Sequence, residues 1–407
     1  MKSIKKGIIL GILLTTLLTR VMAQYNDYFG LLQLNDSTQL PIRFQLTTGD
    51  HPQATFMNGP EKIVADEVTV TGDSLTIRMP VFNSVFHCAW SADKSLKGYW
   101  INHNRTSQNI LPFTAGLQPF SAFYRSEQQL EGHWQVDFSP NDSSNHYQAV
   151  GLFSDKGGAM TGTFLTETGD YRYLSGSGMH LLQHDVLTLS CFDGSHAFLF
   201  TAILQPDGTL KGDFYSGAHW HEPWVARRNE RFELPSPDSL TSLKKGYDRI
   251  DFHFRNLEGA MVSLQDSIFR NKVVIVQIMG SWCPNCMDET RMLEHFYKQY
   301  HAQGLEVVAL AFEKTKDSVL AKANVNRFKT RLGADYPFLL TGDVGIQEAS
   351  DAFPMLHSMM AFPTCIYLDR QGKVKKISTG FNGPGTGIYY TRWMEQTDLF
   401  LQQLLSE

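Results

Sequence analysis

Cysteine is scarce in this sequence, and long apolar runs are almost absent from it. Five cysteines are spread over 407 residues, an odd and widely spaced set that is unlike the framework of a disulfide-stapled domain. Beyond the N-terminal region, no stretch approaches the roughly 20 apolar residues that a membrane-spanning helix needs. With 42% hydrophobic and 19% charged residues, the chain has the composition of a globular protein of two or three domains.

An excess of basic residues is also missing. Residues 1–23 contain four basic residues and no acidic ones, and the rest of the chain contains 32 Lys and Arg against 41 Asp and Glu. The rest of the chain therefore carries a net charge of about −9. Nucleic acid is not expected as a partner, because its phosphates would be repelled.

Residues 1–23 have the pattern of a secretory signal peptide. Three lysines precede an apolar run over residues 7–18, and small residues stand before a predicted cleavage site at Ala23. The run is too short to cross a bilayer as a helix, and no cysteine follows it for lipid attachment. We therefore expect an exported, periplasmic and soluble protein that begins near Gln24, with an uncleaved N-terminal anchor as the alternative.

Residues 24–232 predict an antiparallel all-β domain, either a sandwich or a barrel. Apolar and polar side chains alternate around Ile42, Phe44 and Leu46, which is the period of a half-buried strand. Turn sequences such as Gly-Asp-Ser at 72–74 separate short apolar or aromatic runs, as in a meander of short strands. The sequence does not specify the role of this domain, for which target selection or oligomerisation is the expectation.

Residues 233–248, which include two prolines, predict a linker to a C-terminal α/β domain over residues 249–407. Strand-like and helix-like patterns alternate in that domain, so we expect a mostly parallel sheet that is covered on both faces. The predicted strands are 273–279, 305–312, 337–340, 364–368 and 374–378, and the predicted helices are 290–303, 317–332 and 388–405.

The segment 280–286, Gly-Ser-Trp-Cys-Pro-Asn-Cys, follows the first of these strands and is predicted to open a helix. Two cysteines three positions apart on the first turn of a helix have sulfurs near enough to bridge. The free N–H groups and the dipole at the helix start favour the thiolate of Cys283, which is the nucleophilic form. Cys286 lies one turn further in and is better placed to resolve a mixed disulfide. Half of a zinc site is the alternative, but no second Cys-x-x-Cys follows, and a metal is not expected.

The C-terminal domain resembles the thioredoxin-like proteins of the TlpA/ResA type, which are close to the redoxin and AhpC/TSA group. The matching segments are residues 252–259, 262–264, 272–286 with Trp282 and Pro284, and Phe362-Pro363-Thr364. The resemblance implies a thioredoxin fold and a redox-active disulfide without any other cofactor. It also implies that Pro363 follows a cis peptide bond and, with Thr364 as its neighbour, lies beside the two sulfurs where a target docks.

Two positions refine this resemblance. Gln277 stands where thioredoxin itself has a buried aspartate, so that proton acceptor is absent. Glu289 matches a glutamate of the ResA type and shares a helix face with Cys286. A carboxylate near a thiol raises the pKa of the thiol, so the predicted role of Glu289 is to take a proton from Cys286. The alternative is that Asp288 and Glu289 only complement the helix N-terminus.

The remaining candidates carry weaker signals. The sequence leaves open whether Cys88 and Cys191 form one structural bridge or are buried free thiols. Cys365 is expected to be a buried bystander, and Glu313 a solvated carboxylate at a strand end. The segment His219-Trp220-His221-Glu222 has side chains that could bind a metal or another ligand. A surface for a glycan or a protein could be lined by Trp90, Trp100, Trp134, Trp220 and Trp224. Tryptophans in a β domain are, however, more often core residues.

These residues predict a thiol:disulfide oxidoreductase that acts through Cys283 and Cys286, and the resemblance implies that it is a reductant of disulfides in exported proteins. Its expected partners are protein dithiols and disulfides, and an unidentified membrane or periplasmic electron donor. A thiol peroxidase of the redoxin group is a second hypothesis, although the chain lacks the Thr-x-x-Cys sequence of peroxiredoxins. A third hypothesis is a β-domain binding protein with an accessory redox domain.

Overall fold

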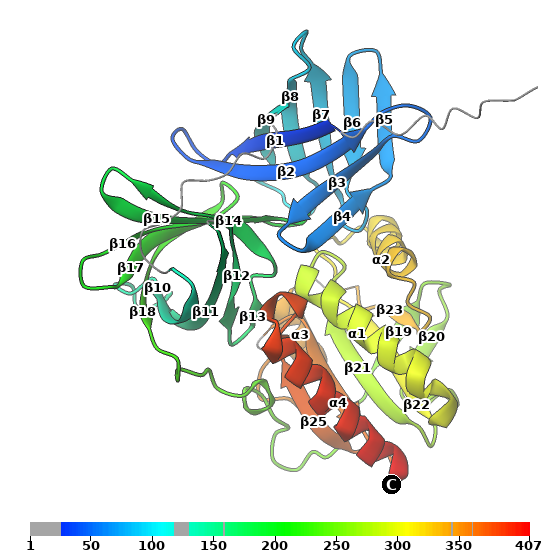
Figure 1. Ribbon diagram of the computed structural model, residues 1–407. Helices are drawn as coiled ribbons and strands as arrows, with labels where there is room; N and C mark the ends of the chain where they lie inside the picture. Colours follow the sequence, from blue (N-terminus) through cyan, green and yellow to red (C-terminus); the bar gives the residue numbers. More distant parts are fainter. Residues whose placement is uncertain (1–25, 118–129, 158, 343–344, 360) are drawn as a thin grey trace, which may run out of the picture.

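The chain forms three units, each built around its own sheet (Figure 1). The computed structural model describes residues 26–117, 130–157, 159–342, 345–359 and 361–407. The predicted signal peptide therefore lies outside the described residues. No helix in the described part of the chain is long and apolar enough to cross a membrane.

The first unit is a nine-stranded antiparallel sheet in the order β4-β3-β2-β1-β9-β8-β7-β6-β5. Alternating apolar residues on its strands meet in one core, where the rings of Phe44, Phe56 and Phe86 pack against one another. Phe192 of the second unit completes this core. The strands are β1 (Asn26–Gln33), β2 (Gln39–Thr47), β3 (Gln53–Asn58), β4 (Glu61–Ala65), β5 (Glu67–Thr71), β6 (Ser74–Arg78), β7 (Ser84–Trp90), β8 (Leu96–Asn102) and β9 (Ile110–Leu117).

The second unit is a closed eight-stranded barrel. Its long strands pair in chain order, and the first of them, β10, also pairs with the last, β18. Aromatic side chains such as Trp134, Phe164 and Trp224 fill the interior. The predicted antiparallel all-β fold is thus confirmed, and it consists of two sheets. The strands are β10 (Gly132–Phe138), β11 (Tyr147–Lys156), β12 (Ala159–Thr166), the two-residue β13 (Gly169–Asp170), β14 (Leu174–Leu181), β15 (His184–Phe192), β16 (Ala197–Leu204), β17 (Leu210–Ser216) and β18 (Trp220–Arg228).

The third unit is a thioredoxin fold with a mixed sheet in the order β20-β19-β23-β22-β21-β24-β25. Its central strands, β21 and β22, are buried along their whole length and run parallel to each other. The expectation of a mostly parallel sheet is wrong, because two hairpins, β19–β20 and β24–β25, supply antiparallel edges. The strands are β19 (His253–Asn256), β20 (Met261–Ser263), β21 (Val273–Met279), β22 (Leu305–Ala311), β23 (Phe338–Leu340), β24 (Thr364–Leu368) and β25 (Val374–Thr379).

Helices cover both faces of this sheet. Side chains of α1, α2 and α4 pack in the core on one face, and α3 packs on the other together with apolar residues of the segment 250–269. Asp317 caps α2 by accepting the backbone N–H groups of Val319 and Leu320, which explains why the sequence pattern located its start. The helices are α1 (Pro284–Tyr300), α2 (Ser318–Leu332), α3 (Ile346–Ala352) and α4 (Ile388–Ser406), with short 3₁₀ turns η1 (Pro237–Ser239), η2 (His301–Gln303) and η3 (Pro384–Thr386).

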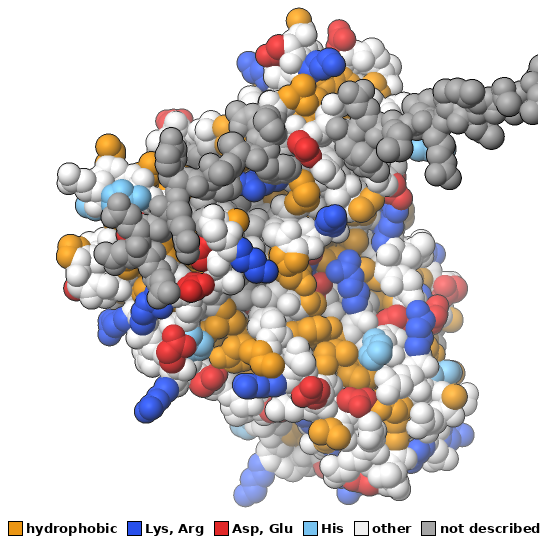
Figure 2. Space-filling model, in the orientation of Figure 1, with side chains coloured by type: hydrophobic (Ala, Val, Ile, Leu, Met, Phe, Trp, Pro, Cys, Tyr) orange, Lys and Arg blue, Asp and Glu red, His pale blue; other side chains and the backbone are white. Residues whose placement is uncertain are grey.

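The segment between the barrel and the third unit packs against the third unit. Thr241 Oγ1 donates a hydrogen bond to the carbonyl of Ser358, and Asp238 pairs with Lys376 at 2.9 Å. Both β units meet the third unit at the end where α1 begins (Figure 1). On the face drawn in Figure 2, acidic and basic side chains are intermixed over the described surface. The contacts between the β units and the third unit include the Cys-x-x-Cys segment and also α2, where Arg331 pairs with Asp66 and Glu67.

Candidate active site

The Cys-x-x-Cys pair lies at the junction of β21 and α1. Cys283 is the N-cap of α1, and its Sγ accepts the backbone N–H of Cys286 at 3.3 Å. Pro284 occupies the first helical position, where its missing N–H costs nothing. Both cysteines are free thiols; Cys283 is 7% exposed, whereas Cys286 is fully buried. The structure thus gives the first sulfur the more accessible position and the helix-start environment.

The start of β24 lies beside Cys283. The Phe362–Pro363 peptide bond is cis, and the Cys283 thiol is 3.6 Å from the carbonyl oxygen of Phe362. Thr364 is buried, and its hydroxyl lies 2.7 Å from that of Thr379. The structure therefore brings Pro363 and its neighbours next to the first sulfur, as the sequence led us to expect.

Trp282 is held in place on the other side of the motif. Its Nε1 donates to the carbonyl of Phe312 at 2.9 Å, and its ring meets the ring of Phe362 edge to face. Lys314 places its ammonium 3.9 Å from the centre of the Trp282 ring, a cation–π contact. The indole is therefore fixed between the redox motif and a cation.

The prediction that Glu313 is a solvated carboxylate is wrong, because its side chain is buried. Its carboxylate accepts the backbone N–H and the hydroxyl of Ser281 at 2.8 and 2.7 Å. Burial raises the pKa of Glu313, and the two bonds from Ser281 act in the opposite direction. Glu313 thus anchors the turn that precedes Trp282 and Cys283.

Glu289 and Gln277 form a buried polar group behind Cys286. Gln277 Nε2 donates to Glu289 at 2.9 Å, and Gln277 Oε1 accepts from the hydroxyl of Thr290 at 3.1 Å. Cys365 is buried, as expected, but it also hydrogen-bonds Glu289. Burial raises the pKa of Glu289 to about 7. Burial, Cys283 and Glu289 all raise the pKa of Cys286, so the carboxyl and the second thiol are electrostatically linked.

Replacing Glu289 with glutamine is expected to slow the step in which Cys286 is deprotonated. Loss of a positioned proton acceptor costs about 10²-fold in rate, so release of a trapped mixed disulfide should slow by that order. The rate of the wild-type step should also rise with pH around 7, following the raised pKa of Glu289, and the variant should lack this inflection. Rapid quenching and mass spectrometry of the mixed disulfide measure both. Superimposable pH profiles would contradict the role.

The same substitution has an expected effect on stability. A carboxyl whose pKa rises from 4.5 to about 7 on folding stabilises the folded state fully below pH 4.5. That contribution is lost as the pH rises through 7, and its size is about 3 kcal/mol. The variant should therefore gain stability relative to the wild type between pH 4.5 and 7, measured by urea unfolding of the two full chains in parallel.

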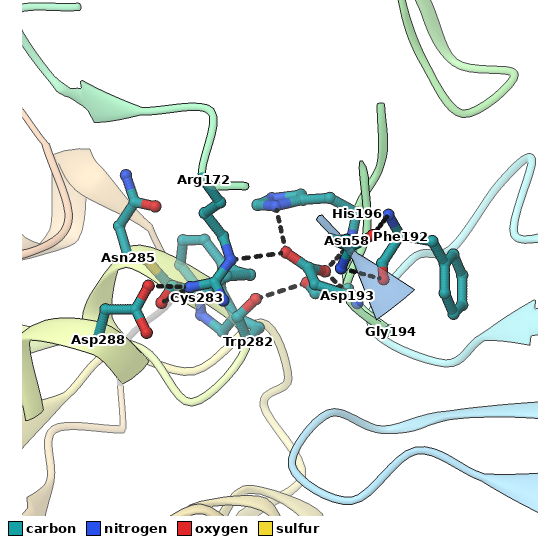
Figure 3. Close-up of polar contacts among 12 residues, drawn as sticks. Asn58, Arg172, Phe192, Asp193, Gly194, His196, Trp282, Cys283, Asn285 and Asp288 are labelled. Carbon is teal, nitrogen blue, oxygen red and sulfur yellow. Dashed lines mark hydrogen bonds and ion pairs between the residues drawn. The ribbon is translucent and has the colours of Figure 1, made fainter. Parts of the chain in front are cut away.

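A buried arginine of the barrel clamps the three units together next to the motif. Arg172 is 1% exposed and reaches between Asp288 of α1 and Asp193 (Figure 3). Its guanidinium pairs with Asp288 and with Glu61 of the first unit, donates to the carbonyl of Pro284 at 3.1 Å, and lies 3.4 Å from Asp193. One side chain of the barrel therefore contacts both β4 and the first turns of α1. We call Glu61, Arg172, Asp193 and Asp288 the Arg172 clamp.

The loop around β13 packs against the same helix start. Asn285, between the two cysteines, donates to the carbonyl of Asp170 at 3.1 Å, and the Asp170 carboxylate accepts the N–H of Gly383 at 2.6 Å. Gly169 has φ of +140°, and a Cβ there would lie 2.3 Å from the Asn285 amide, so only glycine fits. Burial raises the pKa of Asp170 to about 6. The barrel thus touches the residue between the redox cysteines.

Two more contacts cover the motif. Val81 and Phe82, in the loop between β6 and β7, share a buried apolar cluster with Cys283 and Cys286. Ser195, in the loop between β15 and β16, donates its hydroxyl to the carbonyl of Trp282 at 2.7 Å. Sequence reasoning found none of these β-unit residues. No local pattern marks them, because each acts through a partner about 80 or more residues away in the chain.

The other candidates do not form sites of the expected kind. Glu222 points into the barrel and accepts from Ser139 and Tyr147, whereas His221 bonds Asp213. The described residues contain no group of three or more His, Cys, Asp or Glu side chains that could hold a metal. Three of the five tryptophans proposed for a binding surface are core residues: Trp100, Trp134 and Trp224. Cys88 and Cys191 are unbridged and lie in different cores.

Fold and motif together define a thioredoxin-fold protein with a Cys-x-x-Cys pair at the start of α1. The family model described as Redoxin matches residues 245–390. The chain is 31% identical over 140 residues to the thiol-disulfide oxidoreductase ResA of Geobacillus thermodenitrificans, an alignment that covers 34% of this chain and 72% of that relative. Against ResA of Bacillus subtilis the identity is 28% over 139 residues, covering 34% and 69%. The chain belongs to the ResA/TlpA-like thiol-disulfide oxidoreductases of the redoxin group.

Among solved structures, a thiol:disulfide interchange protein of the thioredoxin family from Chlorobium tepidum aligns at 19% identity with a TM-score of 0.31. The alignment covers 40% of this chain and 99% of that one. The family model and the ResA relatives match the C-terminal region, which forms the third unit. The two β units lie outside the residues that the family model matches.

Proposed function

We propose that this chain is an exported reductant of protein disulfides, in which Cys283 is the nucleophile and Cys286 the resolving thiol. The observation that carries the proposal is the geometry of the helix start, where the Cys286 N–H points at Cys283 Sγ from 3.3 Å. An N–H aimed at sulfur and the positive end of the helix dipole favour a thiolate there. The buried second thiol is protected from targets but is one helical turn away from the first.

The reaction follows from these positions. The Cys283 thiolate attacks one sulfur of a target disulfide, which forms an enzyme–target S–S bond and releases the other target sulfur as a thiolate. Cys286 then loses its proton, and its thiolate attacks the Cys283 sulfur and releases the second target thiolate. The target has gained two electrons, and the enzyme holds a Cys283–Cys286 disulfide. The two sulfurs carry the electrons, so the proposal includes no further cofactor.

The surrounding residues support these steps in distinct ways. Glu289 takes the proton of Cys286, and Gln277 holds the Glu289 carboxylate in position. Pro363 presents the backbone of its loop to the target beside Cys283. An external dithiol donor, in the membrane or the periplasm, returns two electrons to the enzyme disulfide and closes the cycle.

The reduction potential of the Cys283/Cys286 pair tests this proposal. For a dedicated reductant we expect a value near that of thioredoxin, about −270 mV. The mature protein would be equilibrated with dithiothreitol or glutathione buffers, and the oxidised fraction counted by alkylation and mass spectrometry. A value well above about −200 mV would indicate an oxidase or isomerase instead, and failure to form the bond would end the proposal. A peroxide-consumption assay on the same protein tests the peroxidase alternative.

A further inference from the structure

A cleft of about 190 Å³ lies where the three units meet, beside the Cys-x-x-Cys motif. Each unit contributes to its wall. The side chains that matter here are Trp100 and Arg105 of the first unit, His196 and His219 of the barrel, and Trp282 and Lys314 of the third unit.

The wall of this cleft carries cations and no carboxylate among the described residues. Arg105 forms no ion pair with any described residue, and Lys314 contacts the Trp282 ring. Glu313 binds Ser281 and also raises the pKa of Lys314, and Asp193 belongs to the Arg172 clamp while lying 3.3 Å from His196. Arg105 is therefore the cation of the cleft that has no acidic partner among the described residues.

The basic groups in the cleft act on one another. The pKa of His219 is lowered to about 4, chiefly by burial and in addition by Arg105, His196 and Lys314. Desolvation lowers the pKa of Lys314, and Arg105 adds to that effect. The Trp100 Nε1 and Arg105 Nε atoms are buried there without a hydrogen-bond partner. An anion in the cleft would reduce this repulsion and would pair with the cationic side chains.

The cleft adjoins the nucleophile. Trp282 directly precedes Cys283, and the charge of Cys283 raises the pKa of Lys314, which places the ammonium within electrostatic reach of the sulfur. Phe82 and the Arg172 clamp cover the motif elsewhere. A substrate segment that reaches Cys283 through this cleft would pass close to Arg105 and Lys314.

We propose that this cleft is a specificity subsite that takes a carboxylate of the disulfide substrate, with Arg105 and Lys314 as its binding partners. The inference rests on the proposed disulfide-reductase function and adds the substrate class to it. A volume of about 190 Å³ holds a side chain or a short segment, not the surface of a folded domain. The carboxylate can belong to an acidic residue next to a cystine in a protein, or to a small disulfide such as oxidised glutathione.

The test compares disulfides that differ only in charge. The reduced full chain is mixed with a cystine peptide flanked by glutamates, with the same peptide carrying glutamines, and with oxidised glutathione. Tryptophan fluorescence follows the oxidation of the enzyme. The readout is the second-order rate constant for the acidic peptide divided by that for the neutral peptide. A loss of activity that affects both peptides equally does not change this ratio. Each of Arg105→Gln and Lys314→Gln is expected to lower this ratio about fivefold. Added salt should lower the wild-type ratio as well.

Two variants serve as controls. Arg105→Lys keeps the charge and should keep most of the ratio, which separates a binding role from a folding defect. Lys211→Gln makes the same charge change at the opposite end of β17 from the cleft residue Ser216, and should leave the ratio as in the wild type.

The outcomes separate the two proposals. A wild-type ratio near 1, or a ratio that Arg105→Gln and Lys314→Gln leave unchanged, overturns the subsite while the reductase function stands. If none of the disulfides oxidises the Cys283/Cys286 pair, the reductase function itself fails. A preference for oxidised glutathione over the acidic peptide supports a small anionic substrate, and the reverse supports a protein segment.

Discussion

Replacing Cys283 with serine is expected to abolish disulfide reduction, whereas replacing Cys286 with serine should stop the reaction at the mixed disulfide. Loss of the nucleophile removes the first step altogether, and the expected fall in the rate of insulin reduction is about 10³-fold or more. In the Cys286 variant the first step remains, because Cys283 keeps its position beside the Phe362 carbonyl. Non-reducing electrophoresis and mass spectrometry should then show a stable enzyme–target adduct through Cys283.

The matched control is a cysteine far from the motif. Cys88 lies in the core of the first unit and is unbridged, so Cys88→Ala should reduce insulin at the wild-type rate. Turnover that survives in Cys283→Ser would contradict the assignment of the nucleophile. An adduct formed through Cys365 would do the same, and it would require a thiol that is fully buried in the structure to become exposed.

Replacing Arg172 with methionine is expected to be the most destabilising single change outside the hydrophobic cores. It removes the cation that the buried carboxylates of Glu61, Asp193 and Asp288 share, and breaking a buried ion pair in this way costs about 3–5 kcal/mol. Asp288 keeps its pair with Arg291, and Asp193 its contact with His196. The β units should also separate more readily from α1. Urea unfolding measures the first effect, and the rate of Cys283 alkylation by iodoacetamide, expected to rise about tenfold or more, measures the second.

An exposed arginine provides the comparison for this variant. Arg331 of α2 pairs with Asp66 and Glu67, but these side chains are 30–52% exposed, so Arg331→Met should cost at most about 1 kcal/mol. Equal effects of the two substitutions would show that the Arg172 clamp contributes no more than a surface pair. An unchanged alkylation rate in Arg172→Met would show that the clamp does not control access to Cys283.

Local features of the third unit could be predicted from the sequence because they depend on neighbouring residues. The run 273–279 is apolar except for Gln277, since β21 is buried on both faces, and Asp317 marks the start of α2 because it caps the helix. The short elements were missed: β20 has three residues and α3 has seven, too few to show a period. The prediction that Glu313 is solvated was wrong, because its hydrogen-bond partner Ser281 lies 32 positions away in the sequence.

The candidate site was predicted from the motif itself and, for Pro363 and Thr364, from the family resemblance. Cys283, Cys286 and Glu289 lie on one helix, so their spacing determines their proximity. The Arg172 clamp joins positions 116 and 111 residues apart across three units. A charged residue in a turn of a β meander is normally solvated, and only the packing of the units buries it. The contacts that the β units make at the redox centre therefore depend on tertiary packing and have no local signal in the sequence.

The loops that cover the redox motif belong to the same chain as the motif itself. A covering segment on a tether acts at an effective concentration in the millimolar range, far above that of any target in free solution. We therefore expect a substrate to compete with Phe82, Ser195 and the β13 loop for the space around the motif. Targets whose disulfides lie in extended segments are expected to enter beside these loops, whereas folded surfaces would have to displace them first, and in this way the β region would select substrates by exclusion.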